Sequence, residues 1–379
     1  MPTFYEFFAG GGMVSAALRP EWECLFANDF DQKKAQAYRA NWGEENFLHC
    51  DIRAIDAAMV PGKADLAWAS FPCQDLSLAG GGAGLKGDRS GTFWPFIKLI
   101  RELRKQGRHP KIVALENVIG TITSHKGKDF ETIVAELNEI GYYVGAIVVD
   151  AALFVPQSRP RLFIIATQER PNELVPRPAM LGYWCTPALL QAYDNLPARS
   201  KERWVWWRLP SPRPRQIDFI DIIEDRPESV HWHTQAETDA LVSLMSDVNR
   251  RKLHDAKIRN RKIVGGLYRR TRYSNGKKIQ RAEVRFDKIS GCLRTPTGGS
   301  SRQFIILVEG GNVSSRLISS RETARLMGLP DSYKLPNKYN EAYHLTGDGV
   351  AVPVVSFIAD HVFRALLGGR DSEKRIAAE

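Results

Sequence analysis

Between residues 4 and 167, short apolar runs alternate with amphipathic stretches along the chain. The apolar runs are short enough to be buried strands, and the stretches between them have the spacing of helices. This repeated strand–helix pattern predicts an α/β fold with a doubly wound, mostly parallel sheet. The runs are TFYEFFAG, CLFAND, ADLAWASF, KIVALENV, GYYVGAIVV and RLFIIAT.

The alternation stops near residue 169, which predicts three segments. Residues 1–169 form the sheet domain. Residues 170–319 are rich in Pro and Arg and show little periodicity, so we predict a second, smaller and irregular domain there. Residues 320–379 contain two helical patterns, the first preceded by a serine cap at Ser319, and we expect these helices to return to the sheet domain.

Several classes of protein are excluded by composition. The chain has no run of about 18 uncharged apolar residues, so we expect no membrane-spanning segment. Its N-terminus has no basic region before the apolar residues, so we expect no secretory signal and a cytoplasmic protein. The five cysteines lie far apart and form no C-x-x-C pair, which argues against a disulfide framework and against a metal site.

The positive charge is concentrated in one segment. Of a formal net charge of +10, residues 250–288 carry 15 Lys and Arg residues with three acidic ones, so the rest of the chain is close to neutral. Clustered basic side chains gain free energy by releasing counterions from phosphate backbones. This segment therefore predicts binding to a polyanion.

A glycine-rich turn and two acidic residues predict a cofactor site. The first apolar run leads into Gly10-Gly11-Gly12, where a ligand can approach the backbone. Asp29 ends the second run 19 residues beyond Gly10, about the separation at which an acid reaches a ribose in such folds. Asp51 ends a third element at the same edge. Two carboxylates favour an adenosine cofactor that carries a cationic sulfonium over one that carries a pyrophosphate.

Four further residues at strand ends are candidates for catalysis. Cys73 follows the fourth run on a proline-stiffened loop, but a thiol of ordinary pKa is only about 3% thiolate at pH 7 and needs nearby positive charge to act as a nucleophile. Glu116 ends the next run, where it can hold or donate a proton. Arg159 and Arg161 point to one face if their segment is extended, and would supply that charge.

Taken in order, the motifs FAGGG, ND, CDI, PCQ, ENV and QSRPR resemble those of the cytosine-C5 DNA methyltransferases. RETARLMGLPDSYKLP and GDGVAVP resemble the C-terminal motifs of the same family. The resemblance covers residues 4–167 and 285–360. It implies a Rossmann-like DNA (cytosine-5-)-methyltransferase of the short bacterial or phage kind, in which residues 170–319 form the target-recognition domain.

The resemblance implies S-adenosylmethionine as the cofactor. It places Asp29 at the ribose, Asp51 at the adenine and Phe30 stacked on the adenine ring. Phe93 is expected to touch the adenine as well. The residues expected to bind the cofactor are Phe8, Ala9, Gly10, Gly12, Asp29, Phe30, Asp51, Ile52, Phe93 and Val350.

The family's chemistry implies that Cys73 attacks C6 of cytosine, so that C5 becomes nucleophilic and accepts the methyl group. Glu116 would hold or protonate N3, while Arg161, together with Arg159, would fix the base and the catalytic groups. Because C6 is inaccessible inside a stacked duplex, we expect the target base to be flipped out.

The expected partner is double-stranded DNA, bound by a monomer. A restriction–modification or epigenetic context follows from the resemblance, which leaves open whether a cognate restriction endonuclease acts on the same site. Arg and Gln side chains suit the reading of base edges, although most such residues contact phosphate or solvent. The candidate DNA-binding residues are Gln74, Ser77, Arg294, Thr295, Ser300, Ser301, Arg302 and Gln303.

Three positions depart from the family pattern. Asp348 stands where the family has Asn, which removes an amide donor and adds a negative charge beside the cofactor. Met13 replaces a further glycine, and Leu76 replaces an aromatic residue. Neither of the last two changes a reacting group.

Three alternative functions remain open at this point. A relative of the family methylates tRNA, although the length of the recognition segment favours DNA. A catalytically silent DNA-binding homologue would not need Cys73, Glu116, Arg159 and Arg161 intact. A nicotinamide dehydrogenase is compatible with the glycine turn but leaves PCQ and ENV without a purpose.

Overall fold

The computed structural model describes residues 1–72, 84–87, 90–171, 182–259, 261–274, 276–295 and 302–368. Its contacts divide the chain into two compact units. The first unit comprises Met1–Asp150, Pro160–Pro212 and Val352–Glu379, and the second comprises Ala151–Arg159 and Arg213–Ala351. Residues 182–212 thus pack with the first unit and residues 320–351 with the second, so the contact boundaries differ from the functional boundaries that we predict at residues 170 and 320.

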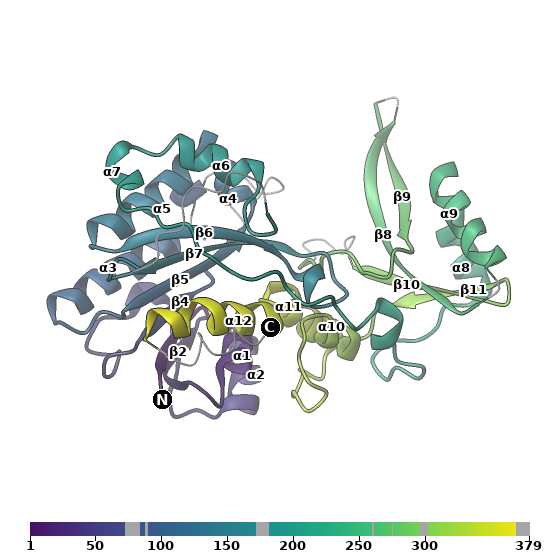
Figure 1. Cartoon of the computed structure of the whole chain (residues 1–379). Coiled ribbons are helices and arrows are strands. Elements are labelled where there is room, and N and C mark those ends of the chain that lie inside the picture. The colour runs from purple at the N-terminus through teal and green to yellow at the C-terminus, as the bar shows by residue number, and fades with distance from the viewer. Residues whose placement is uncertain are drawn as a thin grey trace. The chain divides into compact units, whose positions relative to one another are not determined.

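The first unit is built on a seven-stranded sheet of order β3-β2-β1-β4-β5-β7-β6 (Figure 1). All strand pairs from β3 to β5 are parallel, which confirms the predicted mostly parallel α/β sheet. Buried parallel strands are expected to be apolar throughout, as the strand segment Ile112–Leu115 is. The strands are β1 Thr3–Phe7, β2 Glu23–Asp29, β3 Phe47–His49, β4 Leu66–Ala69, β5 Ile112–Val118, β6 Tyr143–Asp150 and β7 Pro160–Thr167.

Strand β7 is the exception, because it is antiparallel to both of its neighbours, β5 and β6. Only residues 151–159 connect β6 to β7. A parallel crossover needs a dozen or more residues, so this short connection forces β7 to return beside β6 in the opposite direction. The return places the amino end of β7 next to the carboxyl end of β5, with Arg161 paired to Val118.

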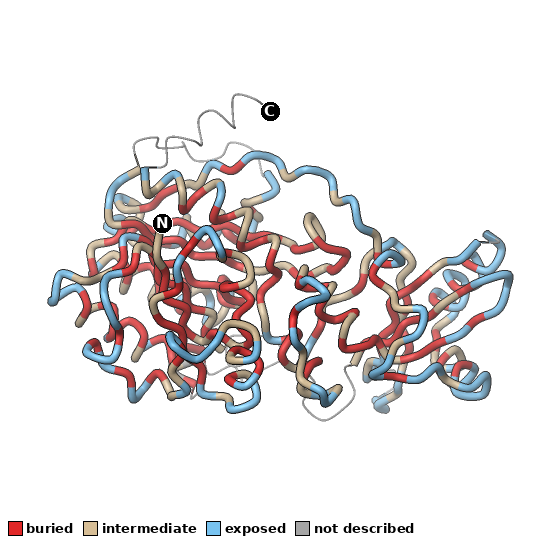
Figure 2. The backbone as a smooth tube through the Cα atoms, turned by 90° about the horizontal axis from the view of Figure 1, so that it is seen from below, coloured by how far each residue is buried: buried red, intermediate tan, exposed pale blue. Residues whose placement is uncertain are grey.

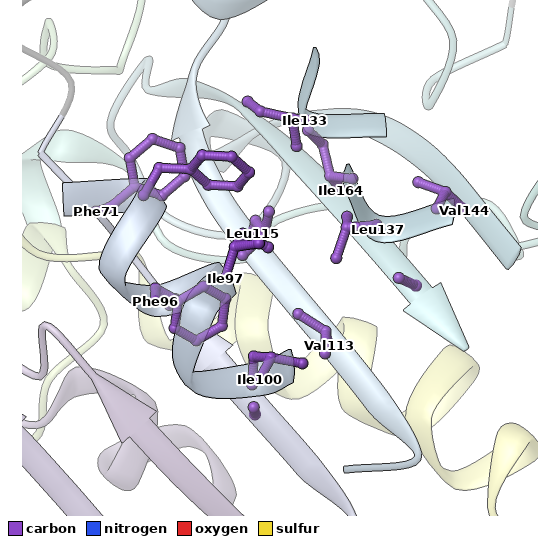
Figure 3. Close-up of a cluster of buried hydrophobic side chains, with 14 of the residues drawn as sticks. Phe71, Phe96, Ile97, Ile100, Val113, Leu115, Ile133, Leu137, Val144 and Ile164 are labelled. Carbon is purple, nitrogen blue, oxygen red and sulfur yellow. The ribbon is translucent and has the colours of Figure 1, made fainter. Parts of the chain in front are cut away.

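Helices α3 and α5 cover one face of this sheet. Val113 and Leu115 are two residues apart on β5, so their side chains lie on the same face of the sheet. Ile97 of α3 and Ile133 of α5 belong to the same buried cluster (Figure 3). In Figure 2 the interior segments of the chain are coloured as buried and many outer loops as exposed. On the opposite face, the Trp68 ring of β4 meets the Phe363 ring near the C-terminus, with ring centroids 6.4 Å apart. Both faces of the sheet are therefore shielded from water.

The helices of the first unit are α1 Met13–Leu18, α2 Gln32–Trp42, α3 Phe93–Lys105, α4 Gly120–Thr123, α5 Lys128–Glu139, α6 Pro187–Asp194, α7 Ala198–Lys201, α12 Val352–Ile358 and α13 Arg364–Leu366. Short 3-10 turns cover Ile52–Ala54, Gly84–Lys86, Ser90–Thr92 and Ser124–Gly127. A π-helical turn over Ala359–Phe363 joins α12 to α13. The tryptophan cluster of residues 204–207 packs locally, because Trp204 is buried against Phe130 and Tyr193.

The second unit contains a four-stranded antiparallel sheet of order β11-β10-β8-β9. The prediction of an irregular domain was therefore incomplete. Arg and Lys occupy both faces of its longest hairpin and hide the alternation that identifies strands. The strands are β8 Ile263–Ser274, β9 Lys277–Arg285, β10 Gln303–Glu309 and β11 Asn312–Leu317. The helices are α8 Gln235–Ser243, α9 Asp247–Ile258, α10 Ser320–Leu326 and α11 Tyr339–Asp348, and 3-10 turns cover Ala151–Leu153 and Phe219–Ile222.

The helical stretch Tyr339–Leu366 has the length and hydropathy of a membrane span, and half of its most apolar window is buried in the fold. It is not continuous, because residues 349–351 separate α11 from α12. Its apolar side chains, including Tyr343, Val355 and Phe363, are buried against other parts of the chain. Core packing therefore accounts for its hydropathy. Ser319 caps α10, as predicted, by accepting the N–H of Glu322 at 3.1 Å.

Candidate active site

The turn after β1 holds its backbone in a strained conformation. Phe8 has φ +58°, which is rare outside glycine, and Gly10 and Gly12 have φ +57° and +76°. A Cβ at Gly10 would meet nothing within 4 Å, whereas a Cβ at Gly12 would lie 2.3 Å from Nε1 of Trp42. Gly12 is thus required by packing, and Gly10 leaves open space beside the backbone. Strain of this kind is commonly kept at ligand sites.

Asp29 joins this turn to the second strand. One carboxylate oxygen accepts the N–H of Gly10 at 2.8 Å, and the other accepts the N–H of Asp31 at 2.8 Å. Burial raises the pKa of Asp29, and these two N–H groups oppose that rise. The structure therefore brings together Gly10 and Asp29, as the spacing predicts.

The other predicted cofactor residues differ in exposure. Phe30 is 63% exposed, and Asp51 pairs with Arg53 at 3.0 Å. Ala9 and Ile52 are buried near the same strand ends. Phe93 is fully buried, with its ring centroid 5.6 Å from that of Phe71. Val350 is buried in the second unit.

Glu116 and Arg161 form an ion pair at the carboxyl edge of the sheet. Nε of Arg161 lies 3.1 Å from Oε1 of Glu116, and the side chains are 15% and 8% exposed. The antiparallel return of β7 makes this contact, because Arg161 stands beside the end of β5. A carboxylate held by a guanidinium has a fixed orientation, which suits a group that hydrogen-bonds a substrate.

Asn117 ties the end of β5 to the chain that leads into Cys73. Its amide donates to the carbonyl of Phe71 at 3.2 Å, while its side-chain oxygen accepts from Val118 N–H and from the Thr121 hydroxyl. Cys73 lies outside the described residues, as do Gln74, Ser77, Ser300 and Ser301. Pro72, immediately before Cys73, is described. We did not predict these hydrogen bonds of Asn117 from the sequence. The signal available there is an amide side chain within the ENV motif.

Arg159 and Arg161 have different partners in the structure. The buried guanidinium of Arg159 donates to the carbonyls of Leu293, Gly347 and Gly349, at 3.1, 2.8 and 2.6 Å. Gly347 lies in the last turn of α11, and Leu293 and Gly349 lie in loops of the same second unit. Arg159 belongs to this unit as well, since the chain returns to the first unit only at Pro160, where β7 begins. Arg159 therefore holds these backbone segments together, while Arg161 pairs with Glu116.

Asp348 has a partner in the structure. Its carboxylate accepts the hydroxyl of Thr295, so an acceptor at this position meets a donor within the same unit. The amide that the family's Asn would add is not needed for this bond. Thr295, a predicted DNA-binding residue, is thereby linked to the turn that Arg159 clamps at Gly347 and Gly349.

Gln303, a candidate DNA-binding residue, is enclosed by other side chains in the structure. It is fully buried, its side-chain oxygen accepts the Tyr268 hydroxyl, and its backbone N–H donates to the Tyr343 oxygen at 3.1 Å. Arg302 lies over the ring of Tyr339, 5.7 Å from its centroid, and Arg294 is exposed. Of the described candidates in this segment, Arg294 is thus the most accessible to a ligand.

Two buried polar residues support the site and were not singled out from the sequence. Glu6 on β1 accepts the N–H groups of Val14 and Ser15 and so holds α1 behind the glycine turn. Burial raises the pKa of Glu6 to about 7. Gln157 donates to the Leu326 carbonyl at 2.9 Å and accepts the Leu293 N–H at 3.0 Å. The sequence signal that could have identified Glu6 is a charged residue inside the apolar run TFYEFF.

We found no group of three or more His, Cys, Asp or Glu side chains placed to hold a metal ion among the residues that the structure describes. Within the same residues, Cys24, Cys50, Cys185 and Cys292 form no disulfide.

Solved structures with a similar fold include methyltransferases. Dnmt2 from S. pombe has a TM-score of 0.57 and 19% identity, covering 97% of this chain and 99% of that one. A DNMT2 mutant from Spodoptera frugiperda has a TM-score of 0.60 and 15% identity, covering 97% and 100%. At this level of identity the likeness concerns the fold alone.

A model of the family described as C-5 cytosine-specific DNA methylase matches residues 2–364. The chain therefore belongs to this family, which confirms the predicted resemblance and the predicted enzyme class, DNA (cytosine-5-)-methyltransferase. Among its relatives, the Type II methyltransferase M.HpaII from Haemophilus parainfluenzae is 27% identical over 377 residues, with 96% of this chain and 90% of the relative covered. M.HhaI from Haemophilus parahaemolyticus is 25% identical, with 96% and 94% covered.

Substitution of the two glycines of the turn is expected to separate an effect on stability from an effect on cofactor binding. Gly12→Ala is expected to lower the free energy of unfolding by about 2–4 kcal/mol, since the methyl group meets Trp42 and the backbone stays left-handed. Gly10→Ala should cost only about 1–2 kcal/mol, but should weaken binding of S-adenosylmethionine because the methyl group fills open space. Calorimetric titration and thermal unfolding measure the two quantities.

Gly43→Ala is the matched control, because Gly43 has φ +85° and a Cβ there meets nothing within 4 Å. It should keep wild-type affinity for the cofactor. Its stability loss should be at least as large as that of Gly10→Ala, because Gly43 has ψ −176° and so lies in a region that is essentially confined to glycine. Wild-type affinity in Gly10→Ala would show that the open space is not part of the cofactor site.

Proposed function

We propose that this protein transfers a methyl group from S-adenosylmethionine to C5 of cytosine within a specific sequence of double-stranded DNA. The observation that carries the proposal is the Glu116–Arg161 ion pair at the end of β5. Next to Glu116, Asn117 bonds to the carbonyl of Phe71, which Pro72 and Cys73 follow in the sequence. The family match supports the reaction class.

The residues at the carboxyl edge fit S-adenosylmethionine. Gly10 leaves its backbone open to a ligand, and the buried carboxylate of Asp29 already accepts the Gly10 N–H. Asp29 would accept the ribose hydroxyls, and Asp51 with Phe30 would hold the adenine. When bound, the cofactor supplies a methyl group as an electrophile on a sulfonium, whose positive charge the two carboxylates favour.

The chain's own residues would prepare the cytosine. The Cys73 thiolate forms a bond to C6, and the displaced electron pair moves toward C5 and N3. Glu116, oriented by Arg161, would hold or supply the proton at N3 and stabilise the charge pushed into the ring. After C5 has accepted the methyl group, a base removes the C5 proton and the sulfur–C6 bond breaks, which releases the thiolate.

The target base would leave the duplex before reaction, because a stacked cytosine does not expose C6 to a thiol. Residues 1–169 would then perform the chemistry, residues 170–319 would recognise the target, and residues 320–379 would complete the fold. We propose that the enzyme acts as a monomer in the cytoplasm. Support for a restriction–modification context comes from relatives that are Type II methyltransferases.

The test is transfer of labelled methyl from S-adenosylmethionine to duplex DNA and, in a separate reaction, to tRNA. Label at C5 of cytosines within one short DNA sequence, located by bisulfite sequencing, is the expected result. Label in tRNA alone would move the substrate to RNA. Label in neither would leave a DNA-binding protein without this activity.

A further inference from the structure

The hairpin of β8 and β9 continues beyond the small sheet. Strand β10 pairs with β8 only from Ile263 to Tyr268, while β9 stays paired as far as Ser274 and Lys277. The segments 269–274 and 277–282 therefore form a two-stranded ribbon, which rises past β10 and β11 in Figure 1. We call these two segments the ribbon.

The ribbon is expected to contribute little to the stability of the isolated protein. A two-stranded hairpin without further packing is only marginally stable in water. The ribbon contains six basic residues and no acidic one, and Arg270 lies directly opposite Arg281. Like charges that face each other across two strands are destabilising. Ala282, at the base of the ribbon, is buried in the core of the second unit. Above Ala282, packing within the protein does not explain the ribbon, whereas a bound polyanion would.

The two faces of the ribbon differ. On one face, Leu267 and Val284 at its base join the core beneath α8 and α9, and above them Thr271 accepts the Gln280 amide at 2.9 Å. The other face, which we call the arginine face, carries Arg270, Arg272 and Arg281 above Tyr268 and Glu283. The side chains of Arg270 and Arg272 are 41% and 51% exposed.

Glu283 organises the arginine face. One of its oxygens lies 3.3 Å from Nε of Arg270, and the other accepts Nε–H of Arg272 at 2.7 Å. One carboxylate thus holds two guanidinium groups side by side and leaves the face with net positive charge. Preorganised arginines lose less conformational freedom when they bind a ligand.

The arginine face lies on the same side of the small sheet as the segment that leads to Arg294. At the base of the ribbon, the Tyr268 hydroxyl donates to the Cys292 carbonyl at 3.1 Å. Two residues later the chain reaches Arg294, and then Thr295 with its bond to Asp348. Tyr268 thus connects the base of the arginine face to the segment that holds Arg294, a candidate DNA-binding residue.

We infer that the ribbon enters the major groove of the DNA substrate with its arginine face toward the bases. Two strands about 4.8 Å apart fit a groove about 12 Å wide, and six residues span about 20 Å of its length. Arginine is the commonest reader of guanine in this groove. Duplex RNA is disfavoured, because its major groove is too deep and narrow for side chains to read. This inference rests on the proposed function and names its specificity-determining residues.

The first test measures binding, independently of methylation. We would titrate a fluorescein-labelled DNA duplex of mixed sequence with the full chain over a series of salt concentrations. The variant R270A/R272A/R281A should reduce the slope of log affinity against log salt by about one to three, since a guanidinium held in the groove neutralises phosphate charge whether or not it also bonds to a base, at up to about 0.9 per charge. The control K63A/K105A/K111A removes three exposed lysines of the first unit. They lie near the amino ends of its strands, whereas the candidate site lies at the carboxyl ends, so this control should keep the wild-type slope.

The second test separates reading from simple attraction. Glu283→Gln removes a negative charge, so it should raise affinity for duplexes of any sequence while lowering the ratio of methylation at the target site to methylation elsewhere by about tenfold. A patch that only attracts phosphate would show the first effect without the second. Circular dichroism verifies that each of these variants, which alter exposed side chains, is folded.

The outcomes distinguish this inference from the proposed function. A wild-type slope in the arginine variant, an equal loss in the lysine control, or an equal loss of binding to an RNA duplex would overturn the ribbon's role even if DNA is methylated. A reduced slope in a protein that methylates no DNA would support the ribbon as a DNA contact and overturn the proposed activity.

Discussion

Cys73→Ala is expected to abolish methyl transfer to DNA, by about a thousandfold or more, with binding of duplex DNA and of S-adenosylmethionine retained. The unsubstituted ring carbon at C5 is a poor nucleophile, and addition of a thiolate at C6 is what makes it reactive. The Glu116 carboxylate, which pairs with Arg161, would act at N3 and does not substitute for the thiolate at C6.

The covalent step can be observed directly. A duplex containing 5-fluorocytosine should form an adduct with the wild-type chain that survives denaturation, because fluorine cannot leave C5 as a proton does. Cys73→Ala should form no such adduct. Cys185→Ala, which alters a buried cysteine of the same unit, is the control and should form it at the wild-type rate. Turnover by Cys73→Ala would exclude the covalent mechanism.

The parts of the site that could be predicted from sequence are those determined by strand order and spacing. Asp29 bonds to Gly10 because parallel neighbours end at one edge, which the alternation of apolar runs predicts. Glu116 reaches that edge for the same reason. Its pairing with Arg161 depends on the antiparallel return of β7, and only the short connection of residues 151–159 indicates this return.

Other roles depend on contacts between residues far apart in sequence. Arg159 and Arg161 are two positions apart, yet one clamps carbonyls beyond residue 290 and the other pairs with Glu116. Gln303 has the side chain of a base reader, but Tyr268 and Tyr343 enclose it. Local pattern contains no information about which loops will surround a given residue, so burial of this kind is not predictable from it.

The largest stability effect is expected at a buried ion pair in the second unit. Arg316 and Glu322 are both fully buried, and two hydrogen bonds join them at 2.6 and 2.8 Å. Glu322 also accepts the N–H groups of Ser319 and Glu224, at 2.7 Å each. The sequence identified this segment only as a capped helix, whereas its carboxylate also connects α10 to residues almost a hundred positions earlier.

Glu322→Ala should lower the free energy of unfolding of the second unit by about 3–5 kcal/mol, because it leaves the Arg316 guanidinium buried without its counter-charge. Hydrogen exchange in residues 213–351 measures this loss without requiring two-state unfolding of the whole chain. Asp331→Ala is the matched control, since Asp331 forms a similar two-bond pair with Arg325 but is 62% exposed, and its loss should cost only about 0–1 kcal/mol. Replacing both partners, as Arg316→Met with Glu322→Leu, should recover much of the lost stability, because no charge then remains buried. If the double variant exchanges as fast as Glu322→Ala, the destabilisation comes from the lost helix cap and the lost bonds to Ser319 and Glu224, and the unpaired charge is not its cause.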